Sequence, residues 1–597
     1  MNGAPCVRER DRMQTMSAPN LIHAGQLIAE TLETHGVRFI FTLCGGHISP
    51  ILVGCKERGL RVVDVRDEAT TVFAADAVAR LSGVPGVAAV TAGPGLTNTI
   101  TAVKNAQMAQ SPVVILGGAT ATVLKNRGSL QDIDQFALMK PHVKWSATLK
   151  RVRDIVPTLK RAFAAAQSDV PGPVFIELPV DLLYPQNVVR DWYRIATDTP
   201  SKNLRQRLEN WYLNRHVGKM FAGASEPIDS SPLPVAIPTH DPAKIRTAAE
   251  WIASAARPVL LIGSQATLNA AEIMFLQKAV AALGVPVYLS GMARGLLGRQ
   301  HTLQFRHQRK RALKEADLVI LAGLPMDFRL NYGRDFGKAT RLIALNRSRH
   351  DLTKNRRPHL PILGDPGYLL RALAGNIGTL PARADWLQAM REREAERETE
   401  IDREAKPTPD AINMVRLCRQ LEEVIGDDSV IVGDGGDFVA TASYIVKPRA
   451  PLTWLDPGAF GTLGAGAGFA LGAKLCRPNA EVWILYGDGS VAYSLSEFDT
   501  FVRHQIPVIA VVGNDASWRQ IAREQVEIFH DDVGTTLRHT DYHRVAQGFD
   551  AEGLCVRTDE EIVPALRRAQ ELAAQGKPVL VNAIYPPTDF RKGSLSM

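Results

Sequence analysis

Short apolar runs rich in β-branched residues alternate with longer stretches of helical periodicity along most of the chain. Over residues 20–190, apolar runs such as VRFIFTL and PVVILGG are separated by helix-like stretches such as ATTVFAADAVARLSG. The same alternation returns over residues 241–375 and 410–597. Strands that alternate with helices form parallel sheets joined by crossover helices. The pattern therefore predicts an α/β protein with three doubly wound parallel-sheet domains.

Three segments fall outside this alternation. Residues 376–409 are highly charged and predict a solvent-exposed linker helix. Residues 1–19 are polar and predict a flexible tail. Residues 191–240 combine a helix-like piece with a proline-rich stretch and predict a linker with a helix. We expect three residues of that helix to dock on a neighbouring domain or subunit rather than on a membrane: Trp211, Tyr212 and Leu213.

The first and third domains share a plan of strand, glycine turn, helix, proline and second strand. Pro94 and Pro112 are 18 positions apart in the first domain, and Asp488 and Pro507 are 19 positions apart in the third. Crossover units of nearly equal length predict related folds, although the residues at the two turns differ.

The composition is that of a globular protein. Of the 597 residues, 45% are hydrophobic and 22% are charged, which argues against a disordered or fibrous chain. The net charge of +8 is spread without a basic tail or a motif that reads nucleic acid. We therefore expect no nucleic-acid partner and favour small anionic molecules as ligands.

Two features predict a cytoplasmic location. The six cysteines form no C-x-x-C pair, which suits free thiols in a reducing compartment. The N-terminal residues lack the apolar core of a signal peptide, and the uncharged stretch over residues 457–473 is too short and glycine-rich for a membrane span. We expect no membrane association.

Two acidic side chains follow two apolar runs of the third domain. The run EVWILY ends in Gly487, Asp488 and Gly489, and the run IPVIAVVG ends in Asn514 and Asp515. Glycines at a strand-to-helix turn bring free N–H groups close to a phosphate. Carboxylates at neighbouring strand ends can share one Mg²⁺. The pair predicts a site for a metal-bound diphosphate, whereas a P-loop motif is absent and the dinucleotide fingerprint is incomplete.

This motif resembles the one with which thiamine diphosphate enzymes bind Mg²⁺ and the diphosphate of their cofactor. From about residue 20 onward the chain is similar to the acetolactate synthase superfamily. Three segments resemble its 2-hydroxyacyl-CoA lyase branch: HGVRFIFTLCGGHISPILV, TAGPGLTNTITAVKNAQMAQSP and WLDPGAFGTLGAGAGFALGAKLCRP. The resemblance implies pyrimidine-binding, central and diphosphate-binding domains, with thiamine diphosphate and Mg²⁺ as cofactors.

By the same resemblance, residues of the third domain bind the cofactor. Asp488, Asp515 and the backbone carbonyl of Ser517 would be the metal ligands, with Asp515 standing where many relatives have asparagine. Leu463 takes the place of the apolar residue that holds the two cofactor rings bent towards each other. An acid at Asp437 is unfavourable beside phosphate. Further contacts to the cofactor are implied for Gly436, Asp437, Gly461, Gly489 and Ser490.

Three residues of the first domain are candidates for catalysis. Glu68 follows the run RVVDV and matches the glutamate that hydrogen-bonds the aminopyrimidine ring in the family. The residues alone fit an acidic helix cap equally well, a role we assign to the neighbouring Asp67. His47 would polarise the substrate carbonyl or act as a general acid, and Gln131 matches a polar residue that lines the family's site.

The resemblance implies a carbon–carbon lyase or carboligase that cleaves a 2-hydroxyacyl-CoA to an aldehyde and formyl-CoA, or performs the reverse condensation. One alternative is an acetolactate synthase that condenses 2-oxo acids with decarboxylation. Another is a non-catalytic, cofactor-binding or regulatory relative. Relatives use the central domain for FAD, ADP or a CoA nucleotide, and we assign none of them. Because relatives place the matching glutamate and aspartate on different subunits, we expect a homodimer or homotetramer.

Overall fold

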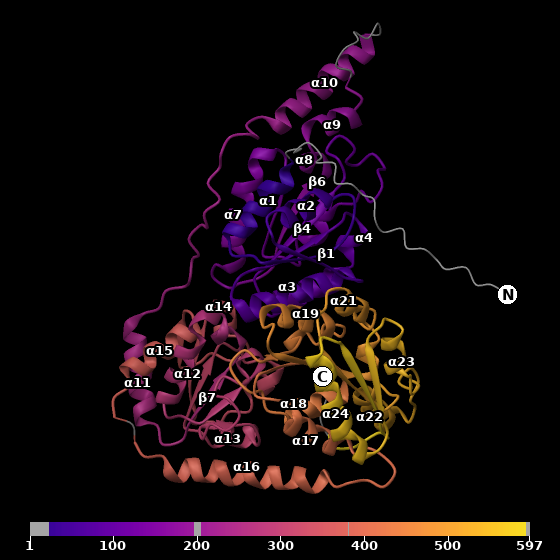
Figure 1. Ribbon diagram of the computed structural model, residues 1–597. Helices are drawn as coiled ribbons and strands as arrows, with labels where there is room; N and C mark the ends of the chain where they lie inside the picture. The colour runs from indigo at the N-terminus through magenta and orange to yellow at the C-terminus, as the bar shows by residue number, and fades with distance from the viewer. Residues whose placement is uncertain (1–22, 196–203, 380, 593–597) are drawn as a thin grey trace, which may run out of the picture.

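The computed structural model describes residues 23–195, 204–379 and 381–592. Three six-stranded sheets with flanking helices follow one another along the chain (Figure 1). Their strands pair in parallel, which confirms the predicted α/β class with three parallel-sheet domains. The tail predicted for residues 1–19 lies outside the described residues.

The first sheet has the strand order β2-β1-β3-β4-β6-β5. Its strands are β1 Phe39–Leu43, β2 Arg61–Asp64, β3 Gly86–Val90, β4 Val113–Ala119, β5 Trp145–Thr148 and β6 Val174–Pro179. The accompanying helices are α1 Ala24–Thr34, α2 Ser49–Glu57, α3 Glu68–Ser82, α4 Pro94–Thr97, α5 Ile100–Met108, α6 Gln135–Met139, α7 Ile155–Gln167, α8 Val180–Leu183, α9 Gln186–Trp192 and α10 Leu204–Phe221.

The central sheet has the order β12-β11-β10-β7-β8-β9, which is the order of a Rossmann-like domain. Its strands are β7 Pro258–Ile262, β8 Val287–Leu289, β9 Gln304–Phe305, β10 Leu318–Ala322, β11 Arg341–Asn346 and β12 Leu360–Leu363. Its helices are α11 Pro242–Ser254, α12 Ile273–Ala282, α13 Arg309–Glu315, α14 Arg349–Leu352 and α15 Pro366–Asn376. Helix α16, Ala384–Glu404, leads from this domain to the third.

The third sheet has the order β14-β13-β15-β16-β18-β17. Its strands are β13 Ser429–Asp434, β14 Trp454–Leu455, β15 Glu481–Gly487, β16 Ile509–Asn514, β17 Glu552–Val556 and β18 Val579–Ile584. Its helices are α17 Met414–Val424, α18 Gly436–Ile445, α19 Gly466–Cys476, α20 Asp488–Val491, α21 Glu497–Arg503, α22 Arg519–Phe529, α23 Tyr542–Gln547 and α24 Asp559–Ala574. Counted from its own first strand, this order equals that of the first sheet, which confirms the internal repeat.

The first and third domains are joined through helices α3 and α19, which lie side by side (Figure 1). Glycines on α19 allow this close approach, because an added Cβ at Gly468 would lie 2.5 Å from the Cβ of Phe73. The rings of Phe73 and Phe469 meet edge to face at 5.8 Å between centroids. The two domains therefore share one hydrophobic core instead of meeting across a polar boundary.

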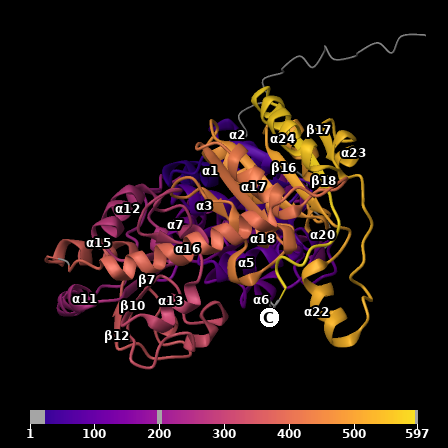
Figure 2. The same cartoon turned by 90° about the horizontal axis from the view of Figure 1, so that it is seen from below.

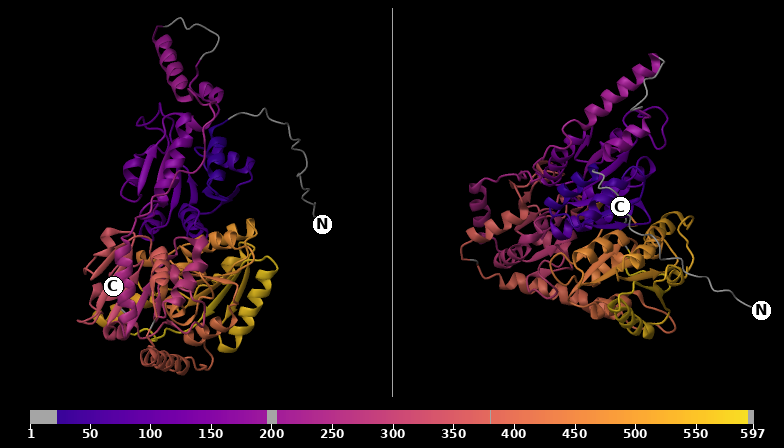
Figure 3. Two further views of the ribbon diagram at one scale, coloured as in Figure 1. Left: turned by 90° about the vertical axis from the view of Figure 1, so that its left-hand side faces the viewer. Right: turned by 45° about the horizontal axis from the view of Figure 1, so that its top comes forward.

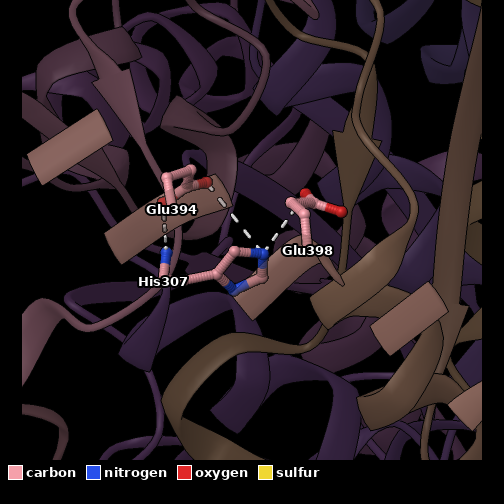
Figure 4. Close-up of side chains that lie close together, drawn as sticks. All are labelled: His307, Glu394 and Glu398. Carbon is pink, nitrogen blue, oxygen red and sulfur yellow. Dashed lines mark hydrogen bonds and ion pairs between the residues drawn. The ribbon is translucent and has the colours of Figure 1, made fainter. Parts of the chain in front are cut away.

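Helix α16 runs beneath the central and third domains and is fastened by a cluster of charged side chains (Figures 2 and 4). Glu394 accepts a hydrogen bond from the backbone N–H of His307 (2.9 Å), and the Nε2 atom of His307 lies 3.3 Å from Glu398. Glu398 is also paired with Arg419 at 2.7 Å and Lys447 at 3.5 Å. Because Arg419 and Lys447 neutralise Glu398, these ion pairs attach the linker helix to the third domain.

Among the described residues, no helix combines the length and the apolar character that a membrane crossing requires.

Candidate active site

The third domain carries a cluster of polar groups where strands β13, β15 and β16 end. The register places Asp434 beside Tyr486 and Gly487 beside Gly513, so these strand ends lie side by side. Helix α18 begins at Gly436, directly after β13, and helix α20 begins at Asp488, directly after β15. Two neighbouring strand-to-helix turns therefore present backbone N–H groups at one edge of the sheet, a geometry suited to phosphate.

Asp488 and Asp515 lie in this cluster, as their positions at two strand ends predicted. Asp488 accepts hydrogen bonds from the backbone N–H groups of Gly489 (2.8 Å) and Ser517 (3.2 Å). Burial raises the pKa of Asp488 to about 6. Burial, followed by the charges of Asp488 and Asp437, raises the pKa of Asp515 to about 7. Two buried carboxyls that disfavour each other's charge form a site that a divalent cation would stabilise.

The loop that contains Gly461 and Leu463 reaches the same cluster. Asp434, which the sequence analysis did not select, holds it by accepting hydrogen bonds from the N–H groups of Gly464 (3.0 Å) and Gly466 (2.7 Å). Leu463 packs directly on Gly435, where a Cβ would overlap the leucine side chain. Gly435 has a φ of +64°, a conformation that glycine adopts without strain. Leu463 is thus held beside the turn between β13 and α18.

Asp437 and Ser490, two of the predicted cofactor contacts, form side-chain hydrogen bonds with other protein groups. The carboxylate of Asp437 accepts a hydrogen bond from Arg523 at 2.9 Å in a buried ion pair. The Ser490 hydroxyl donates to the backbone carbonyl of Asp434. The acid at Asp437 is thus neutralised by an arginine, which removes the repulsion that it would exert on phosphate. Cofactor contacts at these two positions stay predictions, and they would involve the main chain.

Glu68 lies at the carboxyl edge of the first sheet, as the first residue of α3. The predicted helix cap is confirmed at the preceding position, because Asp67 accepts a hydrogen bond from the N–H of Ala69 (2.8 Å). Glu68 is therefore not needed as the cap. Its side chain is buried and accepts a hydrogen bond from Asn98 Nδ2 at 3.0 Å. A buried carboxylate with one neutral partner is available to exchange a proton with a ligand.

His47 and Gln131 lie close to this carboxylate. Thr91 lies between His47 and Glu68. Its hydroxyl is 3.1 Å from His47 Nδ1, and its methyl group packs against Gly95, where an added Cβ would lie 3.5 Å from Glu68 Oε1. Burial lowers the pKa of His47, so its imidazole is neutral at neutral pH. Gln131 packs against Gly93, a glycine in the same turn as Thr91. The three predicted catalytic residues therefore share one edge of the first domain.

The first-domain group and the third-domain group form two separate halves. Within the described residues, no hydrogen bond or ion pair joins Glu68, His47 or Gln131 to Asp488 or Asp515. Sequence reasoning missed residues that support the halves, such as Gln135, whose side chain accepts from the N–H of Gly93 (3.1 Å). It also missed Tyr542, whose hydroxyl donates to the backbone carbonyl of Asp488 (2.8 Å).

We expect Mg²⁺ to stabilise the protein more at about pH 8 than at about pH 5. The folded-state pKa values of Asp488 and Asp515 are raised above 3.8, so the metal-free protein loses stability as pH rises from about 4 through 7. Mg²⁺ would remove this loss. Melting temperatures measured with Mg²⁺ and with EDTA at both pH values test it. Asp515→Asn should reduce the pH dependence to the part that comes from Asp488, and equal shifts at both pH values would contradict a carboxylate metal site.

Comparison with known proteins identifies the family. The chain matches the thiamine pyrophosphate enzyme models for the N-terminal TPP binding domain over residues 22–138, the central domain over 245–373 and the C-terminal TPP binding domain over 434–583. The chain is 52% identical to human 2-hydroxyacyl-CoA lyase 2 over 583 residues, which cover 96% of this chain and 92% of the relative.

Two further relatives agree with this placement. The Bos taurus 2-hydroxyacyl-CoA lyase 2 is 51% identical over 98% of this chain and 93% of its own length. The probable acetolactate synthase of Mycobacterium bovis is 34% identical over 96% of this chain and 98% of its own length. These matches extend over all three sheets and both half-sites. The chain therefore belongs to the thiamine pyrophosphate enzymes, whose cofactor, thiamine pyrophosphate, is the same molecule as thiamine diphosphate.

Proposed function

We propose that the protein is a carbon–carbon lyase that cleaves 2-hydroxyacyl-CoA thioesters to an aldehyde and formyl-CoA, or catalyses the reverse condensation. One observation carries the proposal: identity of 51–52% over nearly the whole chain to relatives named 2-hydroxyacyl-CoA lyase 2. The similarity to an acetolactate synthase is weaker, at 34% identity. A purely non-catalytic relative is disfavoured, because a buried Glu68 and a carboxylate pair at Asp488 and Asp515 are both present.

The third domain would hold the cofactor. Asp488 and Asp515, with the backbone carbonyl of Ser517, would bind Mg²⁺, and the N-termini of α18 and α20 would bind the diphosphate. The raised pKa values of the two carboxyls support this assignment, because both groups gain from a nearby cation. Leu463 would pack against the cofactor from the loop that Asp434 fixes. Bound thiamine diphosphate supplies a nucleophilic carbon and a sink for the electrons released when the carbon–carbon bond breaks.

The first domain would supply the residues that accept and donate protons. Glu68 would hydrogen-bond the pyrimidine ring and exchange a proton with it, because its buried carboxylate has a neutral partner in Asn98. His47, neutral and linked to Thr91, would accept the proton of the substrate's 2-hydroxyl as the bond to the departing aldehyde breaks. Gln131 would orient the thioester by hydrogen bonding. Gly93 lets the turn pack closely against Gln131, because a Cβ at Gly93 would lie 2.9 Å from the Cβ of Gln131.

We also propose that two copies assemble each active site, as a homodimer or homotetramer. Within the described residues, no side-chain hydrogen bond or ion pair joins Glu68 to Asp488, and the two residues lie in different domains. Exposed apolar side chains in the loop around Gln131 support a partner at this edge: Leu124, Leu130, Ile133 and Phe136. A second copy that covers these side chains would bring its own third domain to Glu68.

We further propose a cytoplasmic location. It is supported by the five cysteines of the described residues, all of which are free thiols.

Product analysis tests the substrate proposal. We expect purified protein, loaded with thiamine diphosphate and Mg²⁺, to convert a 2-hydroxyacyl-CoA to the aldehyde that is one carbon shorter and to formyl-CoA, identified by mass spectrometry. The same preparation offered pyruvate would yield little acetolactate. Acetolactate as the main product, together with FAD bound beside the central strand ends at Ser264, Gly323 and Asn346, would favour an acetolactate synthase instead.

A further inference from the structure

Helix α10 projects from the body of the first domain (Figures 1 and 3). Its C-terminal half packs on the domain through the buried side chains of Val217 and Met220. Its N-terminal half instead exposes large side chains at the spacing of one helix face, between 57% and 70% accessible: Leu204, Leu208, Trp211 and Tyr212. An exposed face of this kind marks an interaction surface.

Helix α22 carries a second exposed apolar surface, at the edge of the third domain (Figure 2). The helix begins directly after Trp518, in the loop that contains Asp515 and Ser517. Large side chains of α22 and the turn after it are between 43% and 74% accessible: Ile521, Val526, Ile528, Phe529 and Val533. Of these, Ile521, Ile528 and Phe529 share one helix face.

The two surfaces have opposite charge. Four cations accompany the stripe on α10, against the single acid Glu209: Arg205, Arg207, Arg215 and Lys219. Three acids accompany the surface on α22 and the turn after it: Glu527, Asp531 and Asp532. The two arginines of α22 pair with other acids, Arg519 with Asp589 and Arg523 with Asp437. Apolar faces flanked by complementary charges favour association with each other.

The two helices cannot meet within one chain, because α10 projects from the top of the first domain whereas α22 lies in the third domain below it (Figure 1). Each is nevertheless attached to one half of the active site. Helix α10 follows β6, and the nearby Tyr184 hydroxyl donates to the Gly46 carbonyl (3.1 Å) in the loop of His47. Helix α22 follows the loop of Asp515. An approach that joins the half-sites of two copies therefore brings α10 of one copy towards α22 of the other.

We propose that α10 of one copy packs against α22 of a second copy and closes the side of the shared active site. This inference rests on the proposed two-copy site. It adds that the contact between α10 and α22 shields one side of that site from solvent. By two-fold symmetry the contact occurs twice, once over each cofactor half-site. Within this contact, burial of Trp211 and Phe529 would contribute most of the binding energy, because large aromatic side chains dominate such interfaces.

Truncation of these two aromatics tests the contact. In the full-length protein with thiamine diphosphate and Mg²⁺, we expect Trp211→Ser and Phe529→Ser each to raise the dimer dissociation constant about tenfold or more. Together they should raise it by less than the product of the single effects, because both remove the same contact. Sedimentation measurements give the constants. Phe275→Ser is a matched control, because Phe275 is 60% exposed on α12 of the central domain, and it should leave the dimer unchanged.

Both variants should fold, since Trp211 and Phe529 are 61% and 73% exposed, and circular dichroism checks this. If the wild-type protein is a dimer whose dissociation constant neither variant changes, the contact is wrong and the two-copy active site stands. If the wild-type protein is an active monomer at every concentration, both the contact between α10 and α22 and the active site shared by two copies are wrong. If Trp211→Ser leaves the dimer intact but abolishes binding to vesicles of anionic phospholipid, a lipid surface occupies α10 and the proposal is overturned.

Discussion

Replacing Glu68 by glutamine is expected to lower turnover by about 10²- to 10⁴-fold, the range that a positioned acid–base group contributes. Glutamine has the same shape and can still accept the hydrogen bond from Asn98, but it cannot exchange a proton. The variant should therefore fold and bind thiamine diphosphate normally while product formation falls. Steady-state rates with a 2-hydroxyacyl-CoA, combined with calorimetric titration of the cofactor, measure the two effects separately.

A matched control lies one residue away. Asp67→Asn removes a neighbouring carboxylate but keeps an oxygen that can cap Ala69, so its turnover should stay within about twofold of wild type. Turnover of Glu68→Gln close to wild type, with cofactor bound, would show that this carboxylate does not handle the proton. An equal loss in both variants would mean that the N-terminus of α3 matters for structure alone.

Replacing Asp488 by asparagine is expected to remove Mg²⁺ binding and with it nearly all activity. The side chain would lose the charge that the metal needs, while it could keep the hydrogen bond from the N–H of Ser517 through its remaining oxygen. We expect the affinity for thiamine diphosphate in the presence of Mg²⁺ to fall about 100-fold. Asp499→Asn, which alters a surface ion pair with Arg503, is the control that should retain affinity.

Mixing the two inactive variants, Glu68→Gln and Asp488→Asn, should restore part of the enzyme activity. A mixed dimer of Glu68→Gln and Asp488→Asn copies has one site with both wild-type residues and one site with neither, if each site takes one residue from each copy. Random exchange at equal amounts then returns about a quarter of wild-type activity. Activity that stays at the level of the separate variants after verified subunit exchange would place both residues of one site on the same chain.

Local patterns were sufficient for the fold class and for the position of the polar strand ends. The runs that become β15 and β16 are mostly apolar because both strands are almost wholly buried, and their ends place Asp488 and Asp515 at one edge. The cap at Asp67 could also be predicted, because it depends only on residues next to it. The roles of Glu68 and Leu463 came from a resemblance, since neither a buried acid nor a partly buried leucine has a local signature.

Contacts between distant residues could not be predicted in this way. Asp434 holds Gly464 and Gly466, which are 30 and 32 positions away, and Asp437 pairs with Arg523, 86 positions away. Nothing in the sequence near Asp437 indicates that an arginine will neutralise it. Such pairings depend on which loops the sheet order brings together, and that order is a property of the whole domain.

The packing of α3 on α19 points to the evolutionary history of the chain. Each helix follows the second strand of its own sheet, and the two sheets have the same strand order. The contact therefore joins equivalent surfaces, as the interface of a symmetric homodimer does. Duplication and fusion of an ancestral single-domain gene would leave this trace. In such a lineage one half would have gained the carboxylates at Asp488 and Asp515 and the other would have gained Glu68, so that a catalyst divided between two domains would descend from a single domain that paired with its own copy.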